Sequence, residues 1–189
     1  AFFSLVTIAW STSNNFLFSG ISIFAALVYA FWLICTHDMT HQTLTGWRWI
    51  DSIMPRLIRW PMLWPYSIYA ALHQLHHSWN GSDLRDPERV QWTWEEYHNS
   101  CLLVQWYVRH QCSIDIFLAG GVGLIMKTFI HGWRYRKLLS RLQQKIFLDV
   151  GGMALFHGVM LGFVITNGLL LRYLLFWLIL ERVIGVFMQ

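Results

Sequence analysis

Five of the nine histidines in this 189-residue chain fall into two short clusters. The first cluster, HDMTH, runs from His37 to His41, and the second, HQLHH, runs from His73 to His77. On a helix, residues three or four positions apart lie on the same face. His37 and His41 can therefore converge on one point, and His73 with His76 or His77 on another. Each cluster is able to bind a metal ion.

Imidazole ligands suit zinc, copper, iron or nickel. Zinc normally takes four ligands, so five histidines favour two metal ions. A zinc protease would need a glutamate base in HExxH, but the first cluster has Asp38 there and the second has Gln74. Only His157 lies inside an apolar segment, which disfavours a haem bundle. Neither a disulfide framework nor a thiolate site is indicated, because no CxxC spacing joins the cysteines Cys35, Cys101 and Cys112.

The composition indicates a membrane protein rather than a soluble domain. Hydrophobic residues make up 56% of the chain and charged residues 13%, against about 25% charged in globular proteins. A membrane-spanning helix needs about 20 mostly apolar residues. Three segments meet that length, namely Phe16–Cys35, Ile146–Thr166 and Leu169–Met188. Phe2–Trp10 is interpreted as the last part of a fourth span, in a fragment that begins inside a helix.

The cationic residues predict the orientation of these spans. Twelve of the 14 Lys and Arg residues fall between positions 36 and 145, and cytoplasmic segments carry such an excess. The sequence thus predicts a single all-α integral membrane domain over residues 1–189. Two transmembrane hairpins flank a cytoplasmic and interfacial segment, 36–145, that binds metal. The topology explains the net charge of +4. A nucleic-acid partner is therefore not needed to explain this charge and is disfavoured.

Shorter elements are expected inside the cytoplasmic segment. Trp60–Leu72 and Ile116–Phe129 are apolar but too short to span, and we interpret both as helices on the membrane surface. Asp86-Pro87-Glu88 is typical of a helix start, with Asp as N-cap and Pro at the first helical position. A polar helix is expected to run from there through Tyr97.

At its two histidine clusters the sequence resembles the membrane fatty acid desaturase superfamily, which includes carotenoid ketolases and hydroxylases and alkane hydroxylases. The order is a span hairpin, HDMTH at its cytoplasmic end, HQLHH 36 residues after the first histidine, and a second hairpin. The resemblance implies an O2-dependent oxidoreductase with a non-haem di-iron centre. Its ligands would include His37, His41, His73, His76 and His77.

The resemblance also implies an acyl-lipid substrate and an electron carrier such as a ferredoxin or a cytochrome. The band Arg134, Arg136, Lys137, Arg141 and Lys145 could attract an acidic donor or anionic headgroups. A third histidine box is expected beyond Gln189, so these residues alone should be inactive. Carotenoid or alkane oxygenation is the near alternative, and a non-catalytic remnant is the alternative of another class. The coding sequence after Gln189 would discriminate enzyme from remnant.

The remaining polar residues near the clusters leave alternatives open. His157 is either an extra ligand or a buried histidine bonded across helices. Asp38 either orients a ligand histidine or pairs with Arg48 or Arg56. The other histidines are expected at the surface or around the ligands, namely His98, His110 and His131. A mixed-charge patch could contact a headgroup, order the metal helix or form a solvated loop, and it consists of Asp83, Arg85, Asp86, Glu88 and Arg89.

Overall fold

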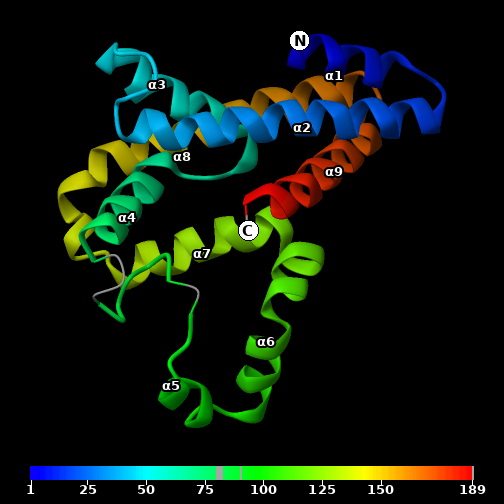
Figure 1. Ribbon diagram of the computed structural model, residues 1–189. Helices are drawn as coiled ribbons and strands as arrows, with labels where there is room; N and C mark the ends of the chain where they lie inside the picture. Colours follow the sequence, from blue (N-terminus) through cyan, green and yellow to red (C-terminus); the bar gives the residue numbers. More distant parts are fainter. Residues whose placement is uncertain (80–82, 90, 189) are drawn as a thin grey trace.

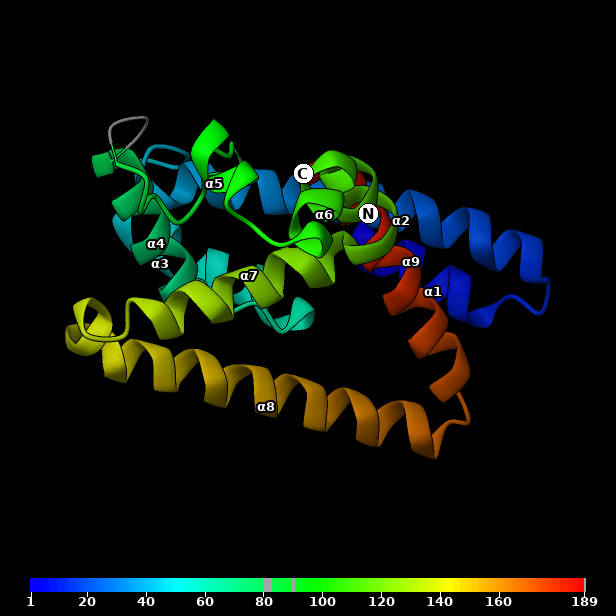
Figure 2. The same ribbon diagram turned by 90° about the horizontal axis from the view of Figure 1, so that it is seen from below.

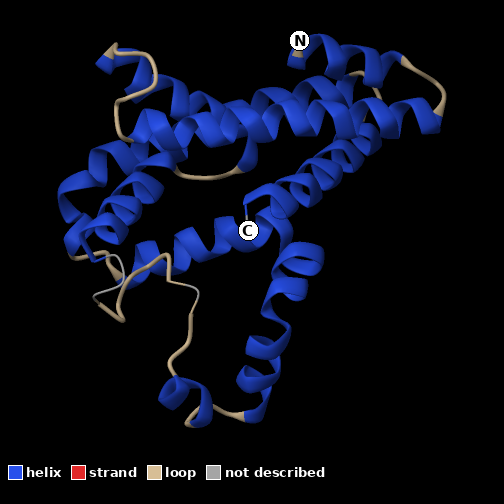
Figure 3. Ribbon diagram, viewed as in Figure 1, coloured by secondary structure: helices blue, strands red, loops and turns tan. Residues whose placement is uncertain are grey.

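The regular secondary structure of the described residues is entirely helical, with no strand (Figure 3). The computed structural model describes residues 1–79, 83–89 and 91–188. At the first predicted hairpin the structure has α1 (Phe2–Ser11) followed by α2 (Asn15–Thr40), and at the second α8 (Gln143–Thr166) followed by α9 (Leu170–Met188). Helices therefore form at all four predicted spans. The expectation of an all-helical chain is confirmed.

Helix α2 continues beyond its apolar part and carries the first histidine cluster at its end (Figure 1). The Asn14 side chain accepts hydrogen bonds from the backbone N–H groups of Phe16 and Leu17 and caps the start of the helix. In the final turns, the Thr36 and Thr40 hydroxyls donate to backbone carbonyls of the same helix. These polar residues are satisfied within the helix, so α2 extends to Thr40.

The segment between the hairpins is also helical. It begins with α3 (Arg48–Arg59), a 3-10 turn η1 (Trp60–Met62) and α4 (Tyr66–Trp79), which carries the second histidine cluster. The elements that follow are α5 (Trp94–His98), α6 (Leu102–Ser113), the π-helical η2 (Ile114–Ala119), α7 (Gly120–Arg134) and η3 (Leu138–Leu142). The predicted surface segment Trp60–Leu72 is thus divided between η1 and α4.

Three helical stretches of the described chain are long and apolar enough to cross a membrane: Asn15–Thr40, Leu102–Arg134 and Leu138–Thr166. The second contains the predicted short segment Ile116–Phe129 within 33 residues of helix. The chain bends within this stretch, at Gly120, where φ is +57° (Figures 1 and 2). The 15 residues of α7 span only about 22 Å at 1.5 Å per residue.

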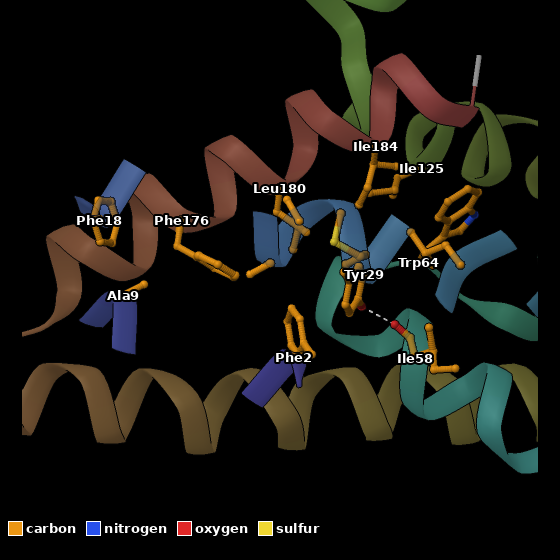
Figure 4. Close-up of a cluster of buried hydrophobic side chains, with 14 residues drawn as sticks. Phe2, Ala9, Phe18, Tyr29, Ile58, Trp64, Ile125, Phe176, Leu180 and Ile184 are labelled. Carbon is orange, nitrogen blue, oxygen red and sulfur yellow. Dashed lines mark hydrogen bonds between the residues drawn. The ribbon is translucent and has the colours of Figure 1, made fainter. Parts of the chain in front are cut away.

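The hydrophobic core lies between α1, α2, α7 and α9 (Figure 4). The rings of Phe2 and Phe176 pack with their centroids 6.4 Å apart, and Phe18, Leu180 and Ile184 belong to the same buried cluster. The Tyr29 hydroxyl donates a hydrogen bond to the Ile58 carbonyl. This bond attaches the end of α3 to α2, so the core fixes the segment that leads from the first histidine cluster to the second.

Helix α8 lies apart from α1 and α2 (Figure 2), and many of its exposed side chains are apolar. Phe147, Leu155 and Val159 are 74%, 70% and 63% exposed. Its other side contacts η1 and α4. Large exposed apolar surfaces mark membrane or protein contacts, and hydrocarbon around α8 would cover these side chains.

Helix α9 carries charged residues that the fold accommodates. The Arg172 guanidinium donates hydrogen bonds to the carbonyls of Ala9, Trp10 and Thr12, at the end of α1. A cation is favoured at a helix C-terminus because the last carbonyls lack partners within the helix. The arginine therefore joins the turns of the two hairpins.

Candidate metal centre

Four of the five predicted ligands meet at the junction of α2 and α4. His37 lies in the last turn of α2 and His41 follows its last residue, while His73 and His77 lie on α4. The Nε2 atom of His73 is 3.1 Å from Nε2 of His41 and 3.1 Å from Nε2 of His77. Ring nitrogens of all four residues lie within 4.8 Å of one another. The structure brings both sequence clusters to one point.

His76, the fifth predicted ligand, lies beside this group of four. Its Nδ1 atom is 2.8 Å from a carboxylate oxygen of Asp86, and its Nε2 is 4.0 Å from Oε2 of Glu88. The His76 and His77 ring centroids are 5.5 Å apart. Its imidazole is held by Asp86 at the edge of the cluster.

Carboxylates contact the outer nitrogens of three of these histidines. His73 Nδ1 lies 3.0 and 3.1 Å from the Glu88 oxygens, and His37 Nδ1 lies 3.0 Å from Oδ1 of Asp38. Such partners fix the tautomer and orientation of a metal-binding histidine and leave Nε2 free. Asp38 therefore contacts its neighbour His37. Its alternative partner Arg56 donates instead to Asp149, at 2.6 Å.

The predicted helix start at Asp86-Pro87-Glu88 is wrong. Residues 83–89 form turns, and a helix begins only at Trp94. Asp86 accepts a hydrogen bond from the backbone N–H of Glu88 at 2.9 Å, which resembles a cap, but the two carboxylates face His76 and His73. Of the open alternatives for this patch, contact with the helix that bears the second cluster is the one observed.

The electrostatics favour a neutral His41 and an ionised Glu88. Burial lowers the pKa of His41, and the neighbouring rings of His73, His37 and His77 lower it further. Burial raises the pKa of Glu88, but its hydrogen bond from His73 and the charges around it lower the pKa overall. An imidazole binds a metal ion in its neutral form, so the lowered pKa of His41 favours that role.

His73 also lies at the end of a stack of planar groups. The ring of Tyr69 is stacked on it, with centroids 5.5 Å apart and planes 9° apart. The Arg59 guanidinium, fully buried, lies 3.6 Å from the centroid of the Tyr69 ring and 4.2 Å from that of Trp64. Cation–π contacts of this kind hold the Tyr69 ring in place, and Tyr69 in turn restrains the plane of His73.

A cavity of about 280 Å³ lies next to the cluster. Tyr69 and Glu88, which both contact His73, form one part of its wall. Apolar side chains and the polar groups of Lys127, Thr128 and His131 form the rest. A small or extended ligand in this cavity would approach the histidines from the side of α7.

The donor set fits metal binding. Two ring nitrogens about 2.1 Å from a shared ion stand roughly 3 Å apart when they subtend a right angle at that ion. The 3.1 Å separations around His73 match that spacing. Imidazoles with carboxylates around them and no thiolate suit iron, zinc or copper. Sequence reasoning predicted these ligands but did not assign Asp86 and Glu88 to individual histidines, since loop contacts leave no periodic signal.

The other histidines lie outside this group. The Nε2 atom of His157 is 3.2 Å from the Trp60 carbonyl and Nδ1 is 3.0 Å from the Tyr173 hydroxyl, so it bonds across helices. His98 stacks on Trp94 at the exposed end of α5, and His110 packs beside Trp106. His131 lines the cavity.

A family model described as fatty acid desaturase matches residues 14–189. The match therefore includes both histidine clusters and every helix from α2 to α9. No curated protein and no solved structure matches the chain.

Proposed function

We propose that this chain, which belongs to the fatty acid desaturase family, holds two iron ions and uses O2 to desaturate the fatty acyl chains of lipids. The observation that carries this proposal is the convergence of His37, His41, His73 and His77 from two distant motifs. The convergence point lies at the end of α2, a helix long and apolar enough to span a membrane. A metal centre there would lie where a lipid tail can reach it.

The histidines would hold the metal ions, and the carboxylates would hold the histidines. His41, His73 and His77 offer Nε2 atoms, while Glu88 accepts the N–H of His73 and fixes its orientation. His76 presents its Nε2 from the edge, with Nδ1 held by Asp86. Iron bound by such ligands supplies the O2 chemistry that removes hydrogen from an unactivated C–H bond. The overall change takes two hydrogens from the substrate, two electrons and two protons, and releases two waters from O2.

The two electrons require an external donor, and we propose an acidic carrier such as a ferredoxin or a cytochrome. Five exposed cationic residues lie between the end of α7 and the start of α8: Arg134, Arg136, Lys137, Arg141 and Lys145. Positive charge accelerates encounter with an acidic protein. The same residues would place this end of the molecule on the cytoplasmic side.

The activity is tested by expressing the full-length coding sequence in a lipid-producing host under air. Mass spectrometry of the fatty acids should show a new double bond. We expect His73→Ala, which removes the central histidine, to abolish the product. His98→Ala, on the exposed end of α5, should retain it and is the matched control.

Other outcomes of the same experiment redirect or overturn the proposal. A hydroxylated acyl chain would assign the protein to fatty acid hydroxylation, and an oxygenated carotenoid or alkane in a suitable host would assign it to those oxygenases. An unchanged lipid profile from well-expressed, iron-loaded protein would overturn acyl desaturation. A product that survives in His73→Ala would show that the histidine group is not the centre of the chemistry.

A further inference from the structure

Asp149 is a fully buried carboxylate in α8. Its Oδ1 accepts a hydrogen bond from Arg56 Nη1 at 2.6 Å and lies 3.4 Å from Nε1 of Trp60. Its Oδ2 accepts from the backbone N–H of Ser67 at 2.6 Å. One side chain thus contacts α3, η1 and α4. Buried carboxylates are retained where they are paired and hydrogen-bonded.

The contact with Ser67 caps α4 from another helix. Ser67 is the second residue of α4, and the first N–H groups of a helix have no acceptor within it. A polar side chain just before the helix usually accepts these bonds, but Pro65 precedes α4 and has no acceptor group in its side chain. Asp149 takes that role and places negative charge at the positive end of the helix dipole.

The same face of α8 holds the connector between the two histidine clusters. A Cβ atom at Gly152 would lie 2.4 Å from the ring of Trp60, so only glycine lets this ring pack on the α8 backbone. His157, five residues further along α8, donates to the Trp60 carbonyl. Arg56 also donates to the Ser67 hydroxyl, at 2.8 Å. These contacts orient α4 relative to α8.

We infer that Asp149 is a positioning residue for the metal centre, because it fixes the rotation and depth of α4 and thereby aligns His73 and His77 with His41. Ser67 precedes His73 by six residues, about 9 Å along the helix. A change at the start of α4 therefore moves both histidines together. The inference rests on the proposed metal-binding function, which it extends to a residue that contacts no ligand.

The test uses full-length protein in lipid nanodiscs, loaded with Co(II) as a coloured probe. Visible absorption of the bound ion reports the number and arrangement of its ligands. For Asp149→Ala we expect about a tenfold weaker affinity for Co(II), the lower end of what outer partners of metal ligands cost, and an altered spectrum per bound ion. Asp149→Asn should change the Co(II) affinity and the spectrum in the same direction. It replaces Asp149→Ala in the test if that variant does not fold.

The control is Glu181→Gln. Glu181 is also a fully buried carboxyl group in a predicted span, but its oxygens make no hydrogen bond within the described residues. We expect this variant to bind Co(II) as the wild type does. A variant at Asp149 that melts earlier but shows the wild-type affinity and spectrum would overturn the positioning role. Equal Co(II) affinity in the wild type and in the His73→Ala variant would overturn the metal centre itself.

Discussion

Both ring nitrogens of His73 have partners, and this arrangement links the proposed metal centre to the loop that follows α4. Nε2 faces His41 and His77 at 3.1 Å, and Nδ1 faces Glu88 at 3.0 Å. A carboxylate at Nδ1 keeps the proton on that nitrogen and leaves the lone pair of Nε2 available. The position of Glu88 therefore controls how well the most buried of the histidines can bind a metal ion.

Replacing Glu88 with glutamine should weaken metal binding. The amide can still accept one hydrogen bond from His73, but it lacks the negative charge that makes the imidazole a better ligand. Loss of such a partner costs about 10–100-fold in metal affinity, which a Co(II) titration can measure. Glu95→Gln, an exposed glutamate on α5, is the control. Equal affinity in wild type and Glu88→Gln would contradict this role.

A second residue-scale prediction concerns Glu96, which lies in the first turn of α5. Its carboxylate accepts hydrogen bonds from Arg89 and from the N–H of Thr93. The Arg89 hydrogen bonds are the main cause that lowers its pKa from 4.5 to about 2. A depressed pKa means that this capping interaction is fully present above pH 4.5 and is lost as the pH falls through 2. NMR titration of the Glu96 carboxyl should show this, and Arg89→Ala should return the midpoint toward 4.5.

The sequence predicted the two histidine clusters but not all of their contacts. Spacing within HDMTH and HQLHH predicted the converging histidines, because i and i+4 positions share a helix face. The Asp-Pro-Glu motif predicted a helix start, and the structure shows turns instead. Asp86 and Glu88 bond to histidines 10 and 15 residues earlier in the chain. No local preference encodes such a contact.

At the scale of elements, hydrophobic runs determined what could be predicted. The spans 16–35 and 146–166 lie within α2 and α8, since long apolar stretches leave little choice of structure. The stretch Leu102–Arg134 was harder, because Asp115 interrupts its apolar residues. In the structure the Tyr107 hydroxyl donates to Asp115 at 2.9 Å, so the chain stays helical through η2. The hydrogen-bond donor for the Asp115 carboxylate thus comes from the preceding turns of the same helical stretch.

The crossing of α7 and α9 depends on glycine. A Cβ atom at Gly185 would lie 2.3 Å from the Cα atom of Gly120, a backbone atom that cannot move aside alone. We expect Gly185→Ala to destabilise the fold by about 1–3 kcal/mol, the range for overpacking. Thermal unfolding in detergent would measure it. Gly158→Ala is the control, because nothing lies within 4 Å of its added Cβ, and an equal loss in both variants would contradict the crowded crossing.

At the scale of the whole molecule, exposed apolar side chains and exposed charged side chains lie in different places. The exposed side of α8 is apolar, whereas five exposed cationic residues precede or begin it. Lipid around the helices and a cytoplasmic location for the charged end would account for both features. The topology is a prediction from loop charges.

The topology predicts which loops are reached from each side of the membrane. In a cysteine-free background, Leu44→Cys lies just after the first histidine cluster and Ser13→Cys lies between α1 and α2. A membrane-impermeant maleimide added to sealed vesicles should label Leu44→Cys from the cytoplasmic side and Ser13→Cys from the opposite side. Labelling of both positions from one side would contradict two transmembrane hairpins with cytoplasmic histidines.

The most direct test of the central claim is the iron content of the purified full-length protein. Mass spectrometry of the metal, combined with Mössbauer spectroscopy, counts the ions and shows whether they are coupled. We predict two coupled iron ions per chain in the wild type and in His98→Ala, and loss of that iron in His73→Ala. Wild-type protein that binds no iron after reconstitution, or His73→Ala protein that retains the coupled pair, would contradict the account.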